Sequence, residues 1–403
     1  MLIRNCSIEG KTGRFNVRIS ADKITEITQF SASFEAKKSE EVFEADGALL
    51  TSALAEPHAH LDKAFLSERI ANPTGDLMGA INAMEANRHL ITVADTIERA
   101  ERAVRLMAST IERAERAVRL MASNGVTAIR THADVTEWNS LDAVEALLEV
   151  RNRTKDLVDL QICALLGWPL SGDEGKKNIQ LGRRAIEMGA NVLGGCPHLD
   201  VDPIGANIAL LDLAGELDCN LDLHTDEHTD VNRLSLEDLA ERVVATGFSN
   251  SVTASHCVSL GMQSHDTQQR VSEKVAHAKI GVVALPHTNL FLQGRDTHSA
   301  PPRGLTAIAA LRRAGVRVAI GADNLQDPFN PIGRGDPLES AGLAILTAHQ
   351  LPEDAFLSVS SVARNIMGLA DAAPKVGSIA DLMLTPSATI REAIASAPPR
   401  TLV

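Results

Sequence analysis

The sequence predicts an α/β protein: a (β/α)8 TIM barrel with a small β-domain built from both chain termini. Two observations lead to this prediction. Eight short apolar runs rich in β-branched residues occur along the chain, and from the second onward most lie about 30 residues apart. Amphipathic helical stretches separate them. Strand and helix alternating in this way form the βα unit, and eight such units close into a parallel barrel.

The barrel strands are expected where apolar residues form short continuous runs, and the helices where apolar residues recur every three or four positions. The expected strands are residues 49–55, 126–131, 158–165, 191–195, 219–223, 251–255, 280–285 and 316–321. The helical stretches between them include residues 141–150, 181–188, 206–217 and 305–314.

The two ends of the chain have a different pattern. Residues 1–48 alternate apolar and polar side chains, which is typical of short strands with one solvated face. GSIADLMLTP, residues 377–386, has the same pattern near the other end. We therefore expect residues 1–48 and 372–403 to form the small β-domain and residues 49–371 to form the barrel.

TIERAERAVRLMAS at residues 96–109 is followed at once by an identical copy at residues 110–123. One perfect pair is typical of a recent duplication or of a sequence-assembly error, whereas solenoid repeats diverge and recur many times. Ile111, Ala114, Val118 and Met121 form one helical stripe, which the first copy repeats. Because 14 residues miss a whole number of turns by roughly 40°, one continuous helix nearly keeps its apolar face. We expect the second copy to pack in the core and the first to project as an added helical arm.

Composition and charge limit the function classes. The 403 residues carry a formal net charge of -13 and no long cluster of Lys and Arg, so nucleic acid is not an expected partner. The N-terminus lacks the pattern of a signal peptide, and no apolar run reaches the length of a membrane span. The five cysteines are scattered without a CxxC pair, which argues against a disulfide framework or a thiolate zinc site. We expect a cytoplasmic protein with no membrane partner, and assembly into a homo-oligomer stays open.

Imidazole and carboxylate side chains stand at the ends of several expected strands. His58 and His60 are two residues apart on an extended segment, so both point to the same face. The fifth, sixth and eighth strands end at His224 with Glu227, at His256, and at Asp323.

A shared metal ion explains these side chains. Catalytic groups of a βα barrel gather at the C-terminal ends of its strands, and buried polar groups there need partners. Three neutral imidazoles and one carboxylate suit one divalent ion, Zn2+ or Fe2+, with a position left for water. The fourth strand end, NVLGGCPHLD, has no lysine that could be carbamylated to bridge two ions, so one metal is favoured.

Seven ordered motifs resemble the amidohydrolase superfamily, and within it the cytosine deaminase-like group, over nearly the whole chain. They are EPHAHLD, RTHADV, DLQICA, LHTDE, TASHC, NLFLQGR and GADNLQDPFNP. The resemblance implies metal ligation by His58, His60, His224 and Asp323.

The same resemblance implies the catalytic roles. Glu227 would carry a proton to a substrate ring nitrogen, and His256 would hydrogen-bond the attacking water or the developing oxyanion. Asp323 would accept the proton of the water, whose pKa a divalent metal lowers from about 16 towards 7.

Further side chains are candidates for substrate contact. Phe329 stands where the family often places an aromatic ring over the substrate, and Gln293 lies in a loop, FLQGR, that resembles the one shaping the family's pocket. Packing for Phe329 and loop anchoring for Gln293 are equally open. Lys63 either contacts an anionic substrate group or pairs with a neighbouring acid. His132, in RTHADV, fills no ligand role and is expected to be a scaffold residue.

Two departures from the cytosine deaminase pattern concern specificity. An aromatic residue, a proline and a glutamine that reads the pyrimidine edge are expected after DLQICA, but Leu170 takes the place of the glutamine behind Trp168. Asn324 replaces an acid that often follows the metal aspartate. Because buried hydrogen-bonding groups discriminate strongly between substrates, both changes put cytosine itself in doubt.

We therefore predict a mononuclear metal-dependent hydrolase that deaminates a nitrogen heterocycle, such as a cytosine-like base with a cyclic amidine, and releases ammonia. The main alternative is an N-alkylaminotriazine hydrolase resembling N-isopropylammelide amidohydrolase, and other amide- or lactam-cleaving members come third. A catalytically inactive scaffold paralogue is the rival from another class. The duplicated helix is its only support. The expected partner is a small heterocyclic molecule.

Overall fold

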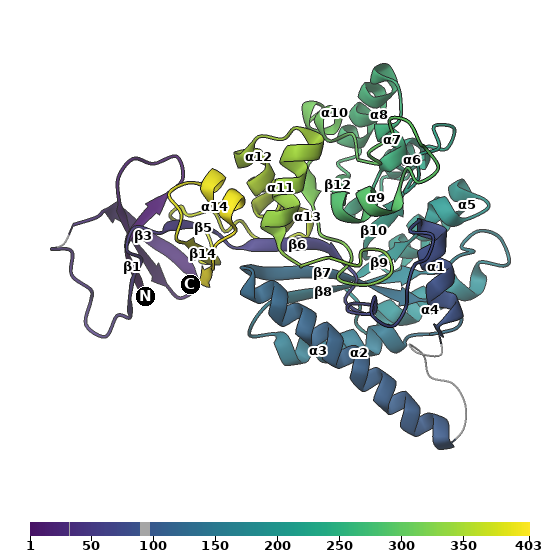
Figure 1. The fold of residues 1–403 in the computed structure, drawn as a ribbon, viewed down its shortest axis with the longest axis horizontal. Helices are drawn as coiled ribbons and strands as arrows, with labels where there is room; N and C mark the ends of the chain where they lie inside the picture. Colours follow the sequence, from purple (N-terminus) through teal and green to yellow (C-terminus); the bar gives the residue numbers. More distant parts are fainter. Residues whose placement is uncertain (32, 89–96) are drawn as a thin grey trace.

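The computed structural model describes residues 1–31, 33–88 and 97–403, with no side chains described for residues 97–108. Two sheets organise the described chain: a parallel sheet of eight strands and a mixed sheet of seven. Figure 1 shows the seven-stranded sheet at one end of the molecule, near both termini, and the eight-stranded sheet among helices at the other.

The eight parallel strands follow one another in chain order around the sheet. An isolated parallel bridge between Ala59 and Asp323 joins the last strand to the first. The predicted (β/α)8 barrel with a separate terminal sheet is therefore confirmed. The strands are β6 (Leu54–Ala59), β7 (Val126–Val135), β8 (Asp159–Leu166), β9 (Val192–Gly195), β10 (Asn220–Thr225), β11 (Val252–His256), β12 (Gly281–Ala284) and β13 (Val318–Ile320).

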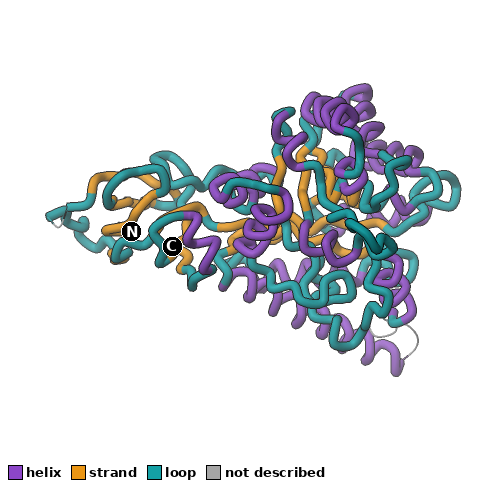
Figure 2. Tube along the Cα trace, turned by 45° about the horizontal axis from the view of Figure 1, so that its top comes forward, coloured by secondary structure: helices purple, strands orange, loops and turns teal. Residues whose placement is uncertain are grey.

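Helices surround the barrel, as Figures 1 and 2 show, and bury apolar faces against it. In α3 (Asp142–Thr154), Val144, Leu147 and Val150 are fully buried, and their spacing of three residues places them on one face. No helix in the described part of the chain has both the length and the apolar character that crossing a bilayer requires. The other long helices are α1 (Leu77–Ala86), α4 (Lys176–Met188), α5 (Pro203–Glu216), α6 (Ser235–Thr246), α8 (His265–His277) and α11 (Pro337–Ala348). The shorter ones are η2 (Pro197–Leu199), α7 (Val258–Gly261), α9 (Pro286–Leu292), α10 (Ile308–Arg313), α12 (Pro352–Ser358), α13 (Ser361–Ile366) and α14 (Ile390–Ser396).

The duplicated segment forms one continuous helix, α2 (Ile97–Ser123); Thr96 lies outside the described residues. In the second copy, the predicted stripe of Ile111, Ala114, Val118 and Met121 is buried in the main core, as expected. Figure 1 shows the N-terminal part of α2 extending past α3 and away from the barrel, which agrees with the projecting arm that the sequence predicts.

The terminal sheet combines strands from both ends of the chain. Its apolar residues form a core of their own, in which Ile3, Val17 and Leu50 are fully buried. The strands are β1 (Leu2–Ile8), β2 (Phe15–Ser20), β3 (Lys23–Gln29), β4 (Val42–Glu44), β5 (Leu49–Ser52), β14 (Leu382–Thr385) and β15 (Thr401–Leu402).

The expected first barrel strand, residues 49–55, is wrong as a single element. Its first part is β5, which pairs with β1 and β14 in the terminal sheet, and its last residues begin β6 in the barrel. Both strands are buried throughout, so hydrophobicity alone does not mark where the chain passes from one sheet to the other. The ranges given to the two domains stay a prediction.

Candidate active site

The four side chains predicted to bind a metal come from three strand ends. His58 lies in β6 and His60 directly follows it, His224 lies in β10, and Asp323 follows β13. Two backbone hydrogen bonds join these ends: the N–H of Asp323 donates to the carbonyl of His58 at 3.0 Å, and the N–H of His60 donates to the carbonyl of Asp323 at 3.2 Å. The bonds that close the barrel therefore also place Asp323 beside the histidine pair.

Glu56, which the sequence analysis did not single out, stabilises the contact between the first and last strand ends of the barrel. Its buried carboxylate accepts one hydrogen bond from the N–H of His58 and another from the N–H of Ala322, each at 3.0 Å. Burial raises the pKa of Glu56 to about 8, although both hydrogen bonds oppose the rise. The signal was present in EPHAHLD, because an acid at the end of an apolar run needs a partner when the strand is buried.

The predicted ligand atoms meet at one point. His60 Nε2 lies 3.2 Å from His224 Nε2, and His58 Nε2 lies 3.3 Å from the same atom. Asp323 Oδ1 lies 3.3 Å from His60 Nε2 and 3.8 Å from His58 Nε2. Ligand atoms held at about 2.0–2.1 Å from a tetrahedral zinc ion are themselves about 3.4 Å apart, and the first three of these separations are close to that value.

The protonation states also fit a cation. Burial, followed by the neighbouring imidazoles, holds the pKa values of His58 and His224 well below the ordinary value, so both rings are neutral. Burial raises the pKa of Asp323, and its Oδ2 atom is buried with no hydrogen-bond partner among the described residues. Neutral imidazoles beside a buried carboxylate with an unpaired oxygen form a donor set for a divalent metal.

Three residues on the barrel floor fix the orientation of His58. Its Nδ1 lies 3.0 Å from Ser255 Oγ, Ser255 Oγ donates to Asp222 Oδ1 at 3.0 Å, and Arg130 Nη1 donates to Asp222 Oδ2 at 2.8 Å. Because the Ser255 proton is directed to Asp222, its oxygen accepts from Nδ1–H of His58. The lone pair of His58 is then on Nε2, which faces the cluster. Such outer partners set the tautomer and orientation of a ligating histidine.

Lys63 pairs with acids. Its Nζ donates to Asp134 Oδ1 at 2.7 Å and lies 3.8 Å from Asp62 Oδ1. Burial opposes the charge, but these two carboxylates raise the pKa of Lys63 above its ordinary value. Nζ also lies 3.2 Å from Nδ1 of His60. A His60 that ligates through Nε2 carries its proton on Nδ1. If His60 binds a cation in this way, its Nδ1 can no longer accept a hydrogen bond from Lys63, and the ammonium group of Lys63 donates to Asp134 alone.

Glu227 and His256 stand beside the cluster. Burial, and then the charge of Asp323, raises the pKa of Glu227 well above its ordinary value. His256 Nδ1 lies 3.1 Å from Asn289 Oδ1 and 3.5 Å from Glu227 Oε1. Both His256 and Asp323 have a positive φ, 68° and 65°, a strained conformation for residues with a side chain that tends to occur at functional sites.

His132 is a member of the cluster that the sequence analysis treated as scaffold. Its ring stacks on that of His58 with centroids 3.8 Å apart, and its Nε2 lies 3.5 Å from Asp222 Oδ1. It is fully buried, and the atoms of His58, His60 and His132 form one of two histidine triads compact enough for a metal. Its place at the end of the second strand was the available signal.

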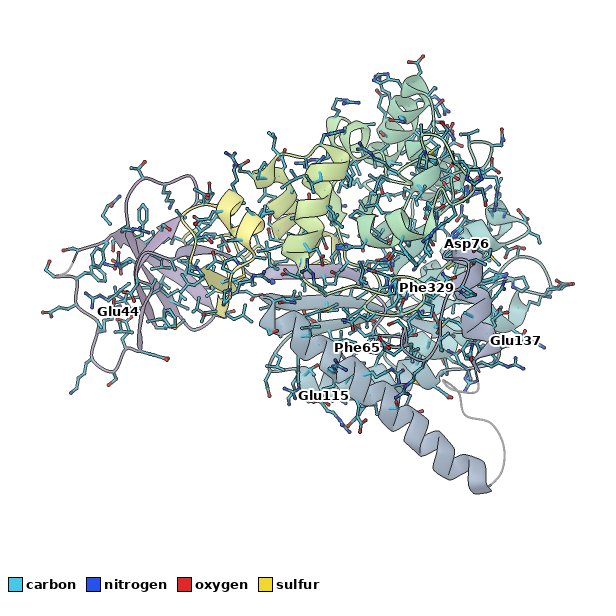
Figure 3. The ribbon with its side chains drawn as sticks, viewed as in Figure 1. Glu44, Phe65, Asp76, Glu115, Glu137 and Phe329 are labelled. Atoms are coloured by element: carbon cyan, nitrogen blue, oxygen red, sulfur yellow. The ribbon has the colours of Figure 1, made fainter. Side chains whose placement is uncertain are left out.

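A cavity of about 300 Å³ opens in front of the cluster. We call the residues at its polar end the inner wall: His60, His224, Glu227, His256 and Asp323. We call the residues at its apolar end the outer wall: Leu77, Ile81 and Met84 of α1, with Trp138 and Trp168. Figure 3 shows Glu137 and Phe329, which also line the cavity, close to α1.

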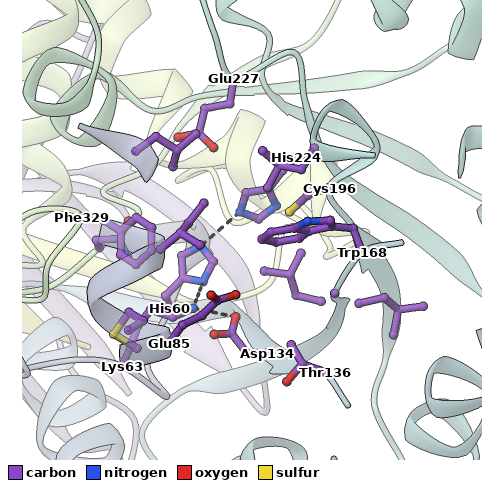
Figure 4. Close-up of a pocket in the computed structure, with 18 of the residues that line it drawn as sticks. His60, Lys63, Glu85, Asp134, Thr136, Trp168, Cys196, His224, Glu227 and Phe329 are labelled. Carbon is purple, nitrogen blue, oxygen red and sulfur yellow. Dashed lines mark hydrogen bonds and ion pairs between the residues drawn. The ribbon is translucent and has the colours of Figure 1, made fainter. Parts of the chain in front are cut away.

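Four of the five predicted substrate contacts line the cavity: Trp168, Phe329, Asn324 and Lys63. Figure 4 shows Phe329 and Trp168 on opposite sides of His60 and His224. Gln293 is not among the described lining residues, and its Nε2 donates to the backbone carbonyl of Glu227 at 3.1 Å. This contact favours the anchoring role left open for Gln293.

Asn324 and Leu170 have structural partners. The amide nitrogen of Asn324 donates to Asp327 Oδ2 at 2.8 Å, and its oxygen accepts from Thr288 Oγ1 at 3.3 Å. Leu170 is buried in the main core and is not among the described residues that line the cavity. The residue at the place of the expected glutamine is therefore a core residue and does not line the described cavity.

The closed parallel barrel and the imidazole–carboxylate cluster at its strand ends define a metal-dependent hydrolase of the (β/α)8 class. A profile of the amidohydrolase family matches residues 76–402, so the chain belongs to that family. The predicted membership is confirmed.

One named protein and two solved structures that are similar to this chain support this assignment. The chain is 33% identical over 335 residues to a pterin deaminase of Rhizobium rhizogenes, covering 82% of this chain and 73% of that protein. The structure of 5-methylcytosine deaminase from Klebsiella pneumoniae with 5-fluorocytosine has a TM-score of 0.88 at 29% identity, covering 100% of this chain and 95% of the other. That of N-isopropylammelide isopropylaminohydrolase from Burkholderia multivorans has a TM-score of 0.81 at 26% identity, covering 100% and 96%.

Proposed function

We propose that the protein is a mononuclear metal-dependent deaminase that hydrolyses an exocyclic C–N bond of a nitrogen heterocycle. The observation that carries the proposal is the convergence of three imidazoles and one carboxylate, with ligand atoms 3.2–3.8 Å apart, from strands distant in sequence. The proposed ligands are His58, His60, His224 and Asp323. Relatives named as deaminases of pterin and 5-methylcytosine support this reaction class.

A divalent metal in this site would supply Lewis-acid activation of a water molecule, whose pKa falls from about 16 towards 7. Asp323 is placed to accept the first proton of that water, because its Oδ2 has no partner among the described residues. The oxygen then adds to the amidine carbon of the ring. Loss of the amine with a proton leaves a ring carbonyl, so water and the aminoheterocycle give the oxo product and ammonia.

Glu227 is the proposed proton donor to the ring nitrogen next to that carbon. A carboxyl with a raised pKa keeps its proton at a pH where an ordinary glutamate has lost it. The activity is therefore expected to fall as the pH rises through the elevated pKa of Glu227.

His256 is proposed to hold the attacking water. Burial lowers its pKa, so the ring is neutral. With the amide of Asn289 oriented as observed, Nδ1–H of His256 donates to Oδ1 of Asn289. Its Nε2 is then an acceptor, and it has no partner among the described residues. An acceptor suits the O–H of a water better than it suits an oxyanion.

A second candidate function is hydrolysis of the same type of bond with a different leaving group. The structural similarity to N-isopropylammelide isopropylaminohydrolase, together with the loss of the polar side chain at Leu170, favours release of an alkylamine from an aminotriazine. The chemistry of the inner wall is the same for ammonia and alkylamine. The two candidates differ only in the leaving group.

The test is metal content together with turnover. Purified protein, a chelator-stripped sample and a reconstituted sample are assayed for zinc and iron, and for ammonia or alkylamine release from cytosine, 5-methylcytosine, isoguanine, creatinine and aminotriazines. One metal ion per chain, with turnover lost on stripping and restored on reconstitution, supports the proposal. Protein that takes up no metal and gives no turnover would support the scaffold alternative.

A further inference from the structure

The outer wall concentrates the rarest large side chains of the protein. The chain has two tryptophans and no tyrosine among its 403 residues, and both tryptophans line the cavity. Trp138 follows β7 and Trp168 follows β8, the neighbouring strand in the barrel. Trp168 keeps 38% of its surface exposed although it is apolar and large. Indoles held at a cavity in this way are suited to stack on a flat ring.

The helix α1 completes this wall with an apolar stripe. Leu77, Ile81 and Met84 are spaced by four and three residues, which places them on one face of the helix, and all three line the cavity. A single six-membered ring held at the inner wall would leave much of the cavity of about 300 Å³ unfilled.

One polar side chain that lines the same cavity has an oxygen without a partner among the described residues. Asn178, at the start of α4, lines the cavity and is 2% exposed. Its Nδ2 donates to the carbonyl of Pro169 at 2.9 Å, next to Trp168, whereas its Oδ1 is buried with no hydrogen-bond partner among the described residues. A buried acceptor without a partner costs free energy, which an N–H of a bound ligand would recover.

We propose that the outer wall selects a fused two-ring aminoheterocycle, whose second ring stacks on Trp138 and Trp168 and donates a hydrogen bond to Asn178 Oδ1. The inference rests on the proposed deaminase function, because it names the substrate class of that site. It assigns a recognition role to Asn178, which lines the cavity, whereas Leu170 is buried in the core.

The experiment compares two substrates with the same reacting ring. Pterin contains the 2-amino-4-oxopyrimidine ring of isocytosine and differs from it by the second, fused ring. Stacking of a heterocycle on an aromatic side chain is worth about 1–3 kcal/mol, so we expect kcat/KM of the metal-loaded full-length protein to be about tenfold or more higher for pterin. Equal or faster turnover of isocytosine would overturn the proposal.

Variants identify the wall responsible. Trp138→Ala and Trp168→Ala should each lower kcat/KM for pterin about tenfold more than kcat/KM for isocytosine. Trp138→Phe and Trp168→Phe, which keep a ring, should restore most of the loss. Leu346→Ala, at a side chain 73% exposed on α11, is the control and should change neither substrate. Equal losses for both substrates would indicate a structural role and would overturn the assignment of the indoles.

Asn178 is tested in the same way. Asn178→Leu should lower kcat/KM for pterin several-fold more than for isocytosine, and Asn178→Asp, which keeps an oxygen there, should lose less. If only the bond to Pro169 matters, both substrates would fall together in both variants, which would overturn the assignment of Asn178.

Tryptophan emission supplies a readout of binding that needs no turnover. Because both indoles of the protein line the cavity, pterin should quench the emission with saturation and isocytosine should not reach the same extent. Saturable quenching by pterin without turnover of any heterocycle would support this substrate class and contradict the proposed deaminase function. Turnover of isocytosine with no quenching by pterin would do the reverse.

Discussion

The inner and outer walls line the same cavity but are built in different ways. The inner wall comes from strand ends, whose positions follow from the parallel register of the barrel: Thr225 pairs with His256, and Ala59 with Asp323. The outer wall comes from α1 and from the segments after β7 and β8, where no sheet register acts. The barrel therefore fixes the reacting groups, while the connecting segments are free to set which molecule reaches them.

The largest expected effect is at the residue that closes the barrel. Asp323→Asn should remove a metal ligand and the proposed proton acceptor together, and lower kcat by about 10³ or more. Metal analysis and ammonia release measure both losses. Phe329→Leu, a change beside α1, should keep one metal ion per chain. Full metal content and turnover in Asp323→Asn would show that the inner wall works without this carboxylate.

The sequence predicts the inner wall well because barrel strands and their ends follow from local patterns. The runs of apolar residues place β7 to β13, and the end of each strand then marks its polar side chain. The division between β5 and β6 could not be predicted, since both are buried and only long-range pairing with β14 separates them.

The second prediction separates the proton donor from the metal. Glu227→Gln should lower kcat by about 10²–10⁴ with metal content unchanged, because a general acid contributes about this much. If the Glu227→Gln protein also loses its metal, Glu227 positions the metal ligands and the loss of turnover does not measure proton donation.

The same variant tests the pKa of Glu227 through stability. The pKa of Glu227 is raised in the folded state, so the native protein binds this proton more tightly than the unfolded chain does. The resulting stability is fully present below the ordinary pKa of about 4.5 and is lost as the pH rises towards the folded-state pKa. Metal-free Glu227→Gln should therefore lose less stability than the parent protein between about pH 5 and pH 8. The free energy of unfolding is measured with urea at both pH values. An equal change in this free energy for the variant and the parent protein would contradict the prediction.

The third prediction concerns the floor beneath the inner wall. Ser255→Ala removes the acceptor for Nδ1–H of His58, and loss of such a partner typically weakens metal affinity about 10–100-fold. Competition with a chelator measures the affinity without turnover. Ser272→Ala is the matched control, since its hydroxyl is also buried but has no partner among the described residues. Unchanged affinity in Ser255→Ala would show that the tautomer of His58 is fixed in another way.

Apart from Trp168, the outer wall and the floor were beyond sequence reasoning, for separate reasons. Trp138, Asn178 and the stripe of α1 lie on elements whose approach to the cavity depends on tertiary packing. The contact of Ser255 with His58 spans 197 residues. Their signals were weak: a tryptophan a few residues after a strand in a chain with two tryptophans is unusual, but the direction of its side chain cannot be predicted from spacing.

The smallest expected effect distinguishes two roles for Gln293, whose amide contacts the backbone of Glu227. If Gln293 anchors the backbone of Glu227, Gln293→Ala should cost about 0.5–1.5 kcal/mol of stability and leave KM within about twofold. Gln268→Ala, which removes a similar amide-to-carbonyl bond away from the inner wall, should lower stability alike. If Gln293 contacts the substrate, KM should rise about tenfold instead, because a lost hydrogen bond then weakens binding. An elevated KM with unchanged stability would move Gln293 to the cavity wall and would mean that the loop closes on the substrate.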